Sequence, residues 1–330
     1  MKALASRSGP CVDTHGGMLA TPRARRVVSG SLQDLLAAWL AERLGARLDA
    51  LTPVGGGCIH QAWCLRLADG GRLFAKTNQA AALAMFEAEA AGLAALARWA
   101  RPPLLVPQPL AVGLAGSQAV LVLPWLHLQG GRGDRCRDWR QLGRSLAELH
   151  RSSCGAQQRY GFEADNFIGS APQINPWQRD WAGFFADCRL GPQLRCAAAA
   201  GRSLRGVRQL LADLPAWLGG HGCEPALVHG DLWSGNAALL APGCGAALFD
   251  PASHWADREV DLAMARLFGG FPPEFFAGYE QTWPLPEGAE QRVVVYNLYH
   301  LLNHANLFGG GYWGQVQASI ENLLEAGPPG

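Results

Sequence analysis

One short segment restricts the fold and chemistry of this chain more than any other: residues 227–236, LVHGDLWSGN. It places Asp231 and Asn236 five residues apart on a tight loop, and Asp250 follows 19 residues after Asp231, at the end of an apolar run. Phosphoryl transfer from a nucleotide needs such a set, because one carboxylate accepts the proton of the attacking hydroxyl while an amide oxygen and a second carboxylate hold the metal ion. The spacing predicts a kinase in which Asp231 is the base and Asn236 and Asp250 bind Mg²⁺, a cation that prefers oxygen ligands.

Two residues near this loop are expected to support it rather than to react. His229 lies just before Asp231, and Asp261 lies further on, in the segment REVDLA. We expect His229 to brace the loop through hydrogen bonds, with Asp261 as its candidate partner. Asp231 could itself be a turn residue, because Asp, Gly and Asn are common in loops. Its spacing from Asn236 and Asp250 favours the catalytic interpretation.

The first part of the chain has the pattern of a nucleotide site. The glycines Gly55, Gly56 and Gly57 lie about 20 residues before Lys76, where they would let the backbone approach phosphates closely. Lys76 is one of only two lysines among 28 basic residues. A compact ammonium on a narrow stem reaches into a phosphate site where a planar guanidinium fits less well. The plain alternatives are an ordinary glycine turn and a surface lysine.

An acidic helix is expected after the lysine strand. Glu89 directly precedes an apolar stretch of this helix, and we expect it to hold Lys76 by an ion pair. Glu87 competes for that role, and a solvated charge is the alternative for either residue. Cys58 directly follows the glycine turn, and we hypothesise that its oxidation blocks nucleotide binding or links two chains. Its alternative is an ordinary small strand residue.

The order of the expected elements predicts two lobes in an α+β chain. Residues 31–126 show a helix, strands, the lysine strand, the acidic helix and two further strands, which indicates a small β-rich nucleotide-binding lobe. Residues 127–330 carry the catalytic loop and mostly helical patterns, so we expect a larger helical lobe that also binds the substrate. Residues 1–30 hold five basic residues and one acid. They predict a disordered or mis-started tail, with a targeting segment as the alternative.

The composition limits partners and location. The formal net charge is +1 with 17% charged residues, which gives no electrostatic footprint for nucleic acid or an anionic membrane. The most apolar region, 102–128, is broken by prolines and does not predict a membrane span. The nine cysteines lack a CxxC pair, so neither a zinc site nor a disulfide framework is indicated. Free thiols in a reducing cytoplasm are the simple interpretation.

The substrate side is less specific. Trp177 and Trp181 lie four residues apart and form either a buried aromatic stripe or a cation-facing wall for an amine substrate. His300 and His304 would share a helix face, but no third ligand nearby completes a zinc site. A position lining the cleft is the better interpretation for Asn303 and His304.

Taken together, these motifs resemble the fructosamine kinases, or ketosamine kinases, which share a bilobal protein-kinase-like fold with aminoglycoside and choline phosphotransferases. The common core is the His-Gly-Asp loop with Asn236, and the narrower signature is the WSG that begins at Trp233, a candidate substrate contact. Further matches, over about residues 50 to 325, are NFIG (166–169), WAGFF (181–185), FDPAS (249–253), REVDLAM (258–264), FGGF (268–271) and LLNH (301–304).

The resemblance implies the fold, the activity and a set of roles. The chain is expected to use ATP and Mg²⁺ to phosphorylate the third-carbon hydroxyl of the sugar part of a ketosamine, after which the adduct decomposes and frees the amine, a deglycation that repairs protein. Carried over by position, Lys76 contacts the phosphates, Asp231 is the base, Asn236 and Asp250 hold the metal, and the backbone at Pro124, Trp125 and Leu126 contacts adenine.

Other functions stay open at this point. The chain could be another small-molecule kinase of the same fold, acting on an aminoglycoside, choline or a sugar. It could also be an inactive ATP-binding module that regulates a partner, although the base, the lysine and the metal ligands are all present. The sequence does not indicate which sugar adduct is used, whether the amine is free or protein-bound, or the oligomeric state.

Overall fold

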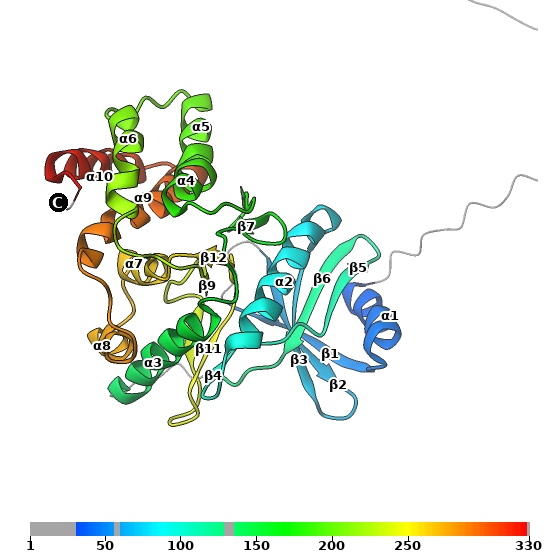
Figure 1. Ribbon diagram of the computed structural model, residues 1–330. Helices are drawn as coiled ribbons and strands as arrows, with labels where there is room; N and C mark the ends of the chain where they lie inside the picture. Colours follow the sequence, from blue (N-terminus) through cyan, green and yellow to red (C-terminus); the bar gives the residue numbers. More distant parts are fainter. Residues whose placement is uncertain (1–30, 56–59, 129–134, 329–330) are drawn as a thin grey trace, which may run out of the picture.

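The computed structural model describes residues 31–55, 60–128 and 135–328, which form two lobes (Figure 1). The first is a five-stranded antiparallel sheet in the order β1-β2-β3-β6-β5, packed by helices α1 and α2. Its elements are α1 (Leu32–Leu44), β1 (Leu48–Val54), β2 (Gln61–Leu67), β3 (Arg72–Gln79), a 3₁₀ turn (Ala80–Ala82), α2 (Leu83–Trp99), β5 (Ala111–Ala115) and β6 (Gln118–Pro124).

The second lobe is mainly helical, as the sequence predicts. Its helices are α3 (Cys136–Ser153), α4 (Trp181–Phe185), a π-helical turn (Ala186–Leu190), α5 (Gly191–Ala199), α6 (Val207–Leu218), α7 (Glu259–Leu267), α8 (Pro273–Thr282), α9 (Ala289–Phe308) and α10 (Tyr312–Ala326). Its short strands are β7 (Asn166–Ile168), β8 (Ala171–Gln173), β9 (Ala226–Val228), β10 (Ala237–Leu239), β11 (Ala246–Leu248) and β12 (His254–Ala256). The α+β bilobal fold is therefore confirmed.

Helices α1 and α2 cover opposite faces of the sheet, and the side chains of β6 show this. Successive side chains of a strand point to opposite faces. Val120 and Val122 lie in an apolar cluster with α1, whereas Leu121 and Leu123 lie in a second cluster with α2. Because both faces are covered, this strand is a nearly continuous apolar run rather than an alternating one.

Local sequence signals set several boundaries. Ser31 and Asp34 form a capping box at the start of α1, and Gly45 ends the helix in the left-handed conformation at φ 64°. Strand β5 begins after the prolines at 107 and 109, because proline has no N–H to donate to a neighbouring strand.

The boundary between the lobes is less simple than a cut after residue 126. The short strand β4 (Leu104–Leu105) lies within the segment assigned to the first lobe, yet it pairs in parallel with β11 of the second. The division at residues 31–126 and 127–330 stays a prediction, and the tail at 1–30 lies outside the described residues.

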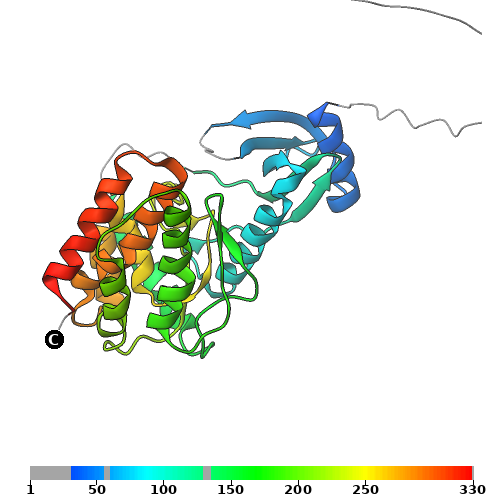
Figure 2. The same cartoon turned by 90° about the horizontal axis from the view of Figure 1, so that it is seen from above.

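Helix α2 joins the two lobes (Figure 2), since it packs on the sheet and also on β7 and α3. A Cβ atom on Gly92 would lie 3.2 Å from Pro251 and 3.4 Å from Ser253 Oγ, so the helix backbone is close to the segment that follows Asp250. Glu89 lies one turn earlier on the same side, because residues three apart are neighbours on a helix. This packing brings Glu89 to the interface between the lobes.

Among the described residues, one helix is long and apolar enough to cross a membrane by length and composition: Ala80–Trp99, which includes α2. The sequence expectation considered only the proline-rich region after it. Helix α2 packs on both lobes, and 28% of its apolar window is buried.

Helices α3 and α8 cross at two glycines, which supports a stability prediction. A Cβ on Gly143 would lie 1.9 Å from the backbone oxygen of Phe275, and a Cβ on Gly278 would lie 2.0 Å from that of Arg140. Overpacking typically costs about 1–3 kcal/mol, and backbone atoms cannot turn aside, so Gly143→Ala is expected to lower the free energy of unfolding by about 3 kcal/mol. The matched control is Gly314→Ala in α10, where a Cβ meets nothing within 4 Å and a stabilisation of up to about 1 kcal/mol is expected. Urea denaturation of both variants tests this, and equal stabilities would refute the close crossing.

Candidate active site

The catalytic loop lies between two small antiparallel strand pairs. It leaves β9, which pairs with β12, and enters β10, which pairs with β11. Asp250 lies two residues after the end of β11, so the β10–β11 pairing returns the chain to the loop. The side-chain Nδ2 of Asn236 donates to Asp231 O at 2.9 Å, to Asp231 Oδ2 at 3.1 Å and to Asp250 O at 3.3 Å. The three residues predicted from spacing therefore meet at one place.

Asp261, at the start of α7, holds the loop in a way that the sequence only partly predicts. Its carboxylate accepts the backbone N–H of His229 at 2.7 Å and of Gly230 at 2.8 Å, rather than the His229 side chain. Gly230 has φ 82°, and a Cβ there would lie 2.2 Å from Ala252 O, so glycine is required. His150 Nε2 lies 3.1 Å from Asp261 Oδ2, and its Nδ1 lies 2.9 Å from the hydroxyl of Tyr279.

The imidazole of His229 braces the loop, as expected, but through other partners. Its Nε2 lies 3.0 Å from Phe249 O, and its Nδ1 accepts the backbone N–H of Asp231 at 3.3 Å. A carbonyl needs a donor and an N–H needs an acceptor, so these contacts select the neutral ring with the proton on Nε2. Burial lowers the pKa of His229, which agrees with this assignment.

The proposed base is held in an electrostatically demanding position. Burial, followed by the nearby carboxylate of Asp250, raises the pKa of Asp231 to about 7. Asp250 has φ 58°, the only described non-glycine residue with positive φ. Asp is among the few residues that occupy this region readily, and such backbone conformations cluster at functional sites. Because the two carboxylates repel each other when both are ionised, a cation is needed near them.

Lys76 supplies positive charge from the other lobe. Its Nζ donates to Glu89 Oε1 at 2.8 Å and also contacts Asp250 Oδ1, so one side chain links β3, α2 and the segment after β11. Glu87, the competing residue, is exposed. Burial raises the pKa of Glu89 to about 7 although Lys76 opposes the rise, while the two carboxylates raise the pKa of Lys76 against the effect of burial. The predicted lysine–glutamate pair is present.

The remaining nucleotide-side predictions are only partly visible. Gly55 follows β1 directly and is exposed, whereas Gly56, Gly57 and Cys58 lie outside the described residues. Pro124 ends β6, and Trp125 and Leu126 follow it as half-buried residues. Their contact with adenine stays a prediction, as does the redox role of Cys58.

The structure separates the predicted substrate residues into two groups. Trp233 is exposed at 36%, and Trp177 is half-buried, with the guanidinium of Arg159 5.2 Å from its ring centroid. By contrast, Trp181 and Asn303 are 3% and 2% exposed. Trp181 belongs to a buried aromatic cluster, which favours the stripe over the wall for this residue, and Asn303 accepts a hydrogen bond from Gln193 at 3.2 Å. A substrate contact by either residue stays a prediction.

The sequence did not predict that His304 lies within a small group of aromatic side chains. His304 is half-buried and packs between Phe268 at 4.6 Å, Phe308 at 5.6 Å and Tyr312 at 5.3 Å, measured between ring centroids. The loop after Phe268 reaches the catalytic loop, because a Cβ on Gly270 would lie 2.3 Å from Ser234 Oγ. The FGGF motif was a usable signal, but sequence alone did not pair it with Ser234.

His300 supports a prediction about pH. It is buried, and desolvation lowers its pKa to about 3, whereas an unfolded histidine titrates near 6.5. Between about pH 6.5 and 3, His300 is therefore protonated in the unfolded chain but not in the folded chain. The free energy of unfolding falls as the pH is lowered through this range. The free energy of unfolding is measured for the wild type and His300→Leu between pH 5.5 and 7.5. Below pH 6.5, its slope against pH is expected to be smaller in His300→Leu than in the wild type by about 1.4 kcal/mol per pH unit. Identical slopes would contradict this assignment.

The fold and the site together define a phosphotransferase of the protein-kinase-like class. A family model described as fructosamine kinase matches residues 32–326, and the chain belongs to that family. The probable ketoamine kinase slr1563 of Synechocystis sp. is 44% identical over 279 residues, which cover 84% of this chain and 91% of the relative. The chloroplastic protein-ribulosamine 3-kinase of Oryza sativa subsp. indica is 37% identical over 298 residues, covering 88% and 84%.

Solved structures agree with this membership. A putative fructosamine-3-kinase from Haemophilus somnus has a TM-score of 0.78 at 28% identity, covering 88% of this chain and 96% of its own. The aminoglycoside phosphotransferase APH(4)-Ia, solved with AMP-PNP and hygromycin B, has a TM-score of 0.59 at 17% identity, covering 89% and 99%, and shows the shared fold. The resemblance inferred from the motifs is confirmed, and the chain is an ATP-dependent kinase.

Proposed function

We propose that this kinase phosphorylates the sugar part of ketosamines such as ribulosamines or fructosamines, at the third-carbon hydroxyl. The observation that supports this most strongly is the meeting of Asp231, Asn236, Asp250 and Lys76 between the two lobes of a fructosamine kinase family member. The related rice protein is named a protein-ribulosamine 3-kinase. Phosphate on the third carbon would then cause the adduct to decompose and free the amine, so the reaction serves deglycation.

Asp231 is the proposed base. A sugar hydroxyl is far less acidic than a carboxylic acid, so Asp231 accepts its proton late, as the new bond to phosphorus forms. The hydrogen bond from Asn236 Nδ2 to Asp231 Oδ2 fixes the orientation of the carboxylate. Most of the rate enhancement then comes from positioning and from the charge around the phosphates.

The residues present fit a magnesium ion. All the contacts described for the Asn236 amide use Nδ2, which leaves its oxygen to act as a ligand. The Asp250 side chain is 42% exposed and already contacts a cation, Lys76. Carboxylate and amide oxygens are hard ligands of the kind Mg²⁺ prefers. When bound, the ion neutralises phosphate charge, while Lys76 contributes a second positive charge from the first lobe.

Two further assignments belong to this proposal. The backbone at 124–126 contacts adenine and the glycines at 55–57 cover the phosphates, which is supported by Pro124 at the end of β6 and by Gly55 directly after β1. The protein acts in the cytoplasm, which is supported by the free thiols Cys64, Cys154, Cys188, Cys196, Cys223 and Cys244.

ATP consumption by the purified protein with Mg²⁺ tests the substrate class. Ribulose-lysine, fructose-lysine, choline and an aminoglycoside are offered side by side at equal concentration. Turnover on a ketosamine is expected, and the ratio of kcat/KM values ranks the two sugars. Turnover on choline or the aminoglycoside alone would overturn the substrate assignment while leaving the kinase class intact.

A further inference from the structure

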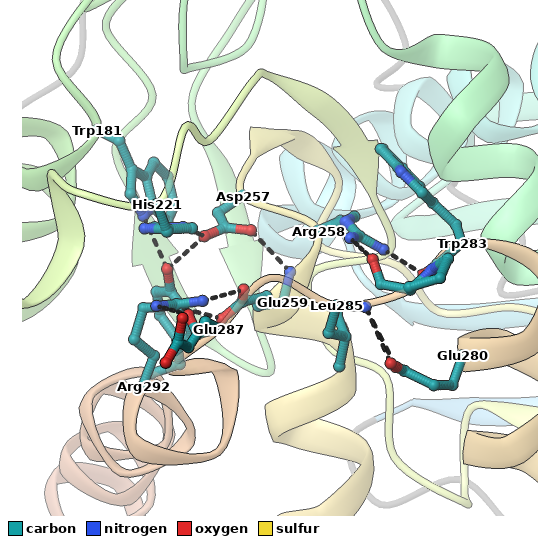
Figure 3. A network of polar contacts seen from close by, with 12 residues as sticks. Trp181, His221, Asp257, Arg258, Glu259, Glu280, Trp283, Leu285, Glu287 and Arg292 are labelled. Carbon is teal, nitrogen blue, oxygen red and sulfur yellow. Dashed lines mark hydrogen bonds and ion pairs between the residues drawn. The ribbon is translucent and has the colours of Figure 1, made fainter. Parts of the chain in front are cut away.

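A second cluster of reactive side chains lies at the end of the β9–β12 strand pair that is opposite the catalytic loop, and Figure 3 shows two of its members, His221 and Asp257. His221 and Cys223 belong to the segment between α6 and β9, and Asp257 directly follows β12. His221 Nε2 lies 2.6 Å from Asp257 Oδ2, and one ligand atom from each of the three residues lies within 4.8 Å of the others. No step of the proposed phosphoryl transfer uses these residues.

The strand register explains why they meet. Ala226 of β9 pairs with Ala256 of β12 in antiparallel fashion, so the chain entering β9 and the chain leaving β12 lie at the same end of the ladder. The loop from His229 leaves the opposite end and carries the proposed base. Residues more than 30 positions apart in the chain are thus brought together by two three-residue strands.

We propose that His221, Cys223 and Asp257 form a binding site for a zinc ion. Imidazole nitrogen, thiolate sulfur and carboxylate oxygen are the three ligand types that Zn²⁺ takes in proteins, and three protein ligands plus one water complete a tetrahedral arrangement. Softer or harder ions fit less well, because Mg²⁺ and Ca²⁺ disfavour sulfur and Cu(I) disfavours carboxylate. A cation reaches the site from the side of Cys223, which is partly exposed.

An unpartnered atom at the cluster is a second indication. The His221 side chain is only 5% exposed, and its Nδ1 is buried without a hydrogen-bond partner among the described residues. Buried polar atoms nearly always have a partner, so this ring is incompletely satisfied by the hydrogen bond to Asp257 alone. In the zinc-bound state, one ring nitrogen coordinates the ion, which replaces the direct contact between His221 and Asp257.

The surroundings already orient two of the ligands. Tyr296 donates its hydroxyl to Asp257 Oδ2 at 2.5 Å, and the backbone N–H of Glu259 donates to Asp257 Oδ1 at 2.9 Å. The hydroxyl of Tyr160 donates to Cys223 O at 2.9 Å and lies 3.4 Å from Cys223 Sγ, so it holds the backbone of this ligand and is near its sulfur. Such outer contacts fix ligand geometry in metal sites.

Charge and protons balance when the ion binds. The thiol of Cys223 gives its proton to the solvent, and the resulting thiolate together with the Asp257 carboxylate neutralises Zn²⁺. His221 coordinates the ion through a ring nitrogen that carries no proton. The adjacent Glu259 carboxylate is already paired with Arg292 at 2.7 and 2.8 Å, so it adds no uncompensated charge.

Zinc at this place would link the chain that enters β9 to the chain that leaves β12. Asp257 lies four residues before Asp261, just ahead of α7, and Asp261 holds the catalytic loop through two backbone N–H groups. The ion would therefore stabilise the segment that supports the loop without touching ATP or substrate. The expected readouts are metal affinity and thermal stability.

Metal titration of the untagged, fully reduced protein tests the proposal. Co²⁺ is the spectroscopic probe, because coordination by a thiolate gives a ligand-to-metal charge-transfer band, and Zn²⁺ is then added to displace it. We expect one equivalent of Co²⁺ with that band and a higher Tm with Zn²⁺. His221→Asn and Cys223→Ser are each expected to lose more than about 100-fold in affinity, beyond the 10–100-fold typical of outer-contact changes.

The control is Cys196→Ser, which removes an exposed thiol and is expected to keep both the band and the rise in Tm. Circular dichroism of each variant without metal shows whether it folds, and His221→Gln is a second variant should His221→Asn not fold. Absence of the band in the wild-type protein would overturn the proposal. So would a band that survives in folded His221→Asn and Cys223→Ser, since binding would then lie elsewhere.

Discussion

The variant Asp231→Asn is expected to lose about 10²–10⁴-fold in kcat on a ketosamine, the usual contribution of a positioned general base. Asparagine keeps the size of the side chain and an oxygen to accept the hydrogen bond from Asn236, but it cannot take up the proton of the sugar hydroxyl. ATP binding should change little, because Lys76, Asn236 and Asp250 remain. Steady-state kinetics and the Kd of ATP with Mg²⁺ together separate the two effects.

A matched surface variant makes this result interpretable. Asp213→Asn changes a half-buried aspartate on α6 whose exposed hydrogen bond to Gln209 is its only described contact. Its kcat should stay within about twofold of the wild type, on the order of a surface substitution. A variant at Asp231 that turns over at a similar rate would show that this residue is not the base.

Lys76→Met is expected to abolish measurable transfer and to destabilise the protein. The lysine is 7% exposed, and its loss leaves Glu89 buried without its counter-charge, a change that costs about 3–5 kcal/mol. In this variant Glu89 becomes protonated near neutral pH, because its pKa is already raised to about 7 when the lysine is beside it. A raised carboxyl pKa means that the folded variant loses stability as pH rises, by about 1.4 kcal/mol per unit between pH 6 and 7.

The double variant Lys76→Met/Glu89→Gln separates charge from packing. The introduced glutamine side chain carries no charge, so most of the lost stability should return at pH 8 while transfer stays absent. Urea denaturation at pH 6 and pH 8 measures the effect for the single and double variants. A single variant as stable as the wild type at pH 8 would contradict the buried pair, and retained activity would remove Lys76 from the phosphate site.

The sequence predicted those parts of the site that depend on short spacing or on periodicity. Asn236 reaches Asp231 because the two lie five positions apart on a tight loop, and Glu89 contacts Lys76 because the helix that follows the lysine strand packs on the same sheet. The bilobal fold followed from the order of strands and helices. Each of these signals is local or lies between neighbouring elements.

Contacts between distant segments were beyond that reasoning. The pairing of β4 with β11 joins residues 104–105 to 246–247, and nothing in either segment specifies the other. Asp261 was identified as a partner of the loop, yet its acceptance of two backbone N–H groups depends on how α7 packs. Cysteine spacing alone indicated no zinc site, because the His221, Cys223 and Asp257 cluster depends on strand register.

Product analysis tests the central claim most directly. The purified protein is incubated with ATP, Mg²⁺ and ribulose-lysine, and the mixture is followed by phosphorus NMR and mass spectrometry. The account predicts a ketosamine carrying phosphate on the third carbon of the sugar, then release of lysine, with neither product formed by Asp231→Asn. ADP and inorganic phosphate without a phosphorylated ketosamine, or phosphate at another carbon, would contradict it.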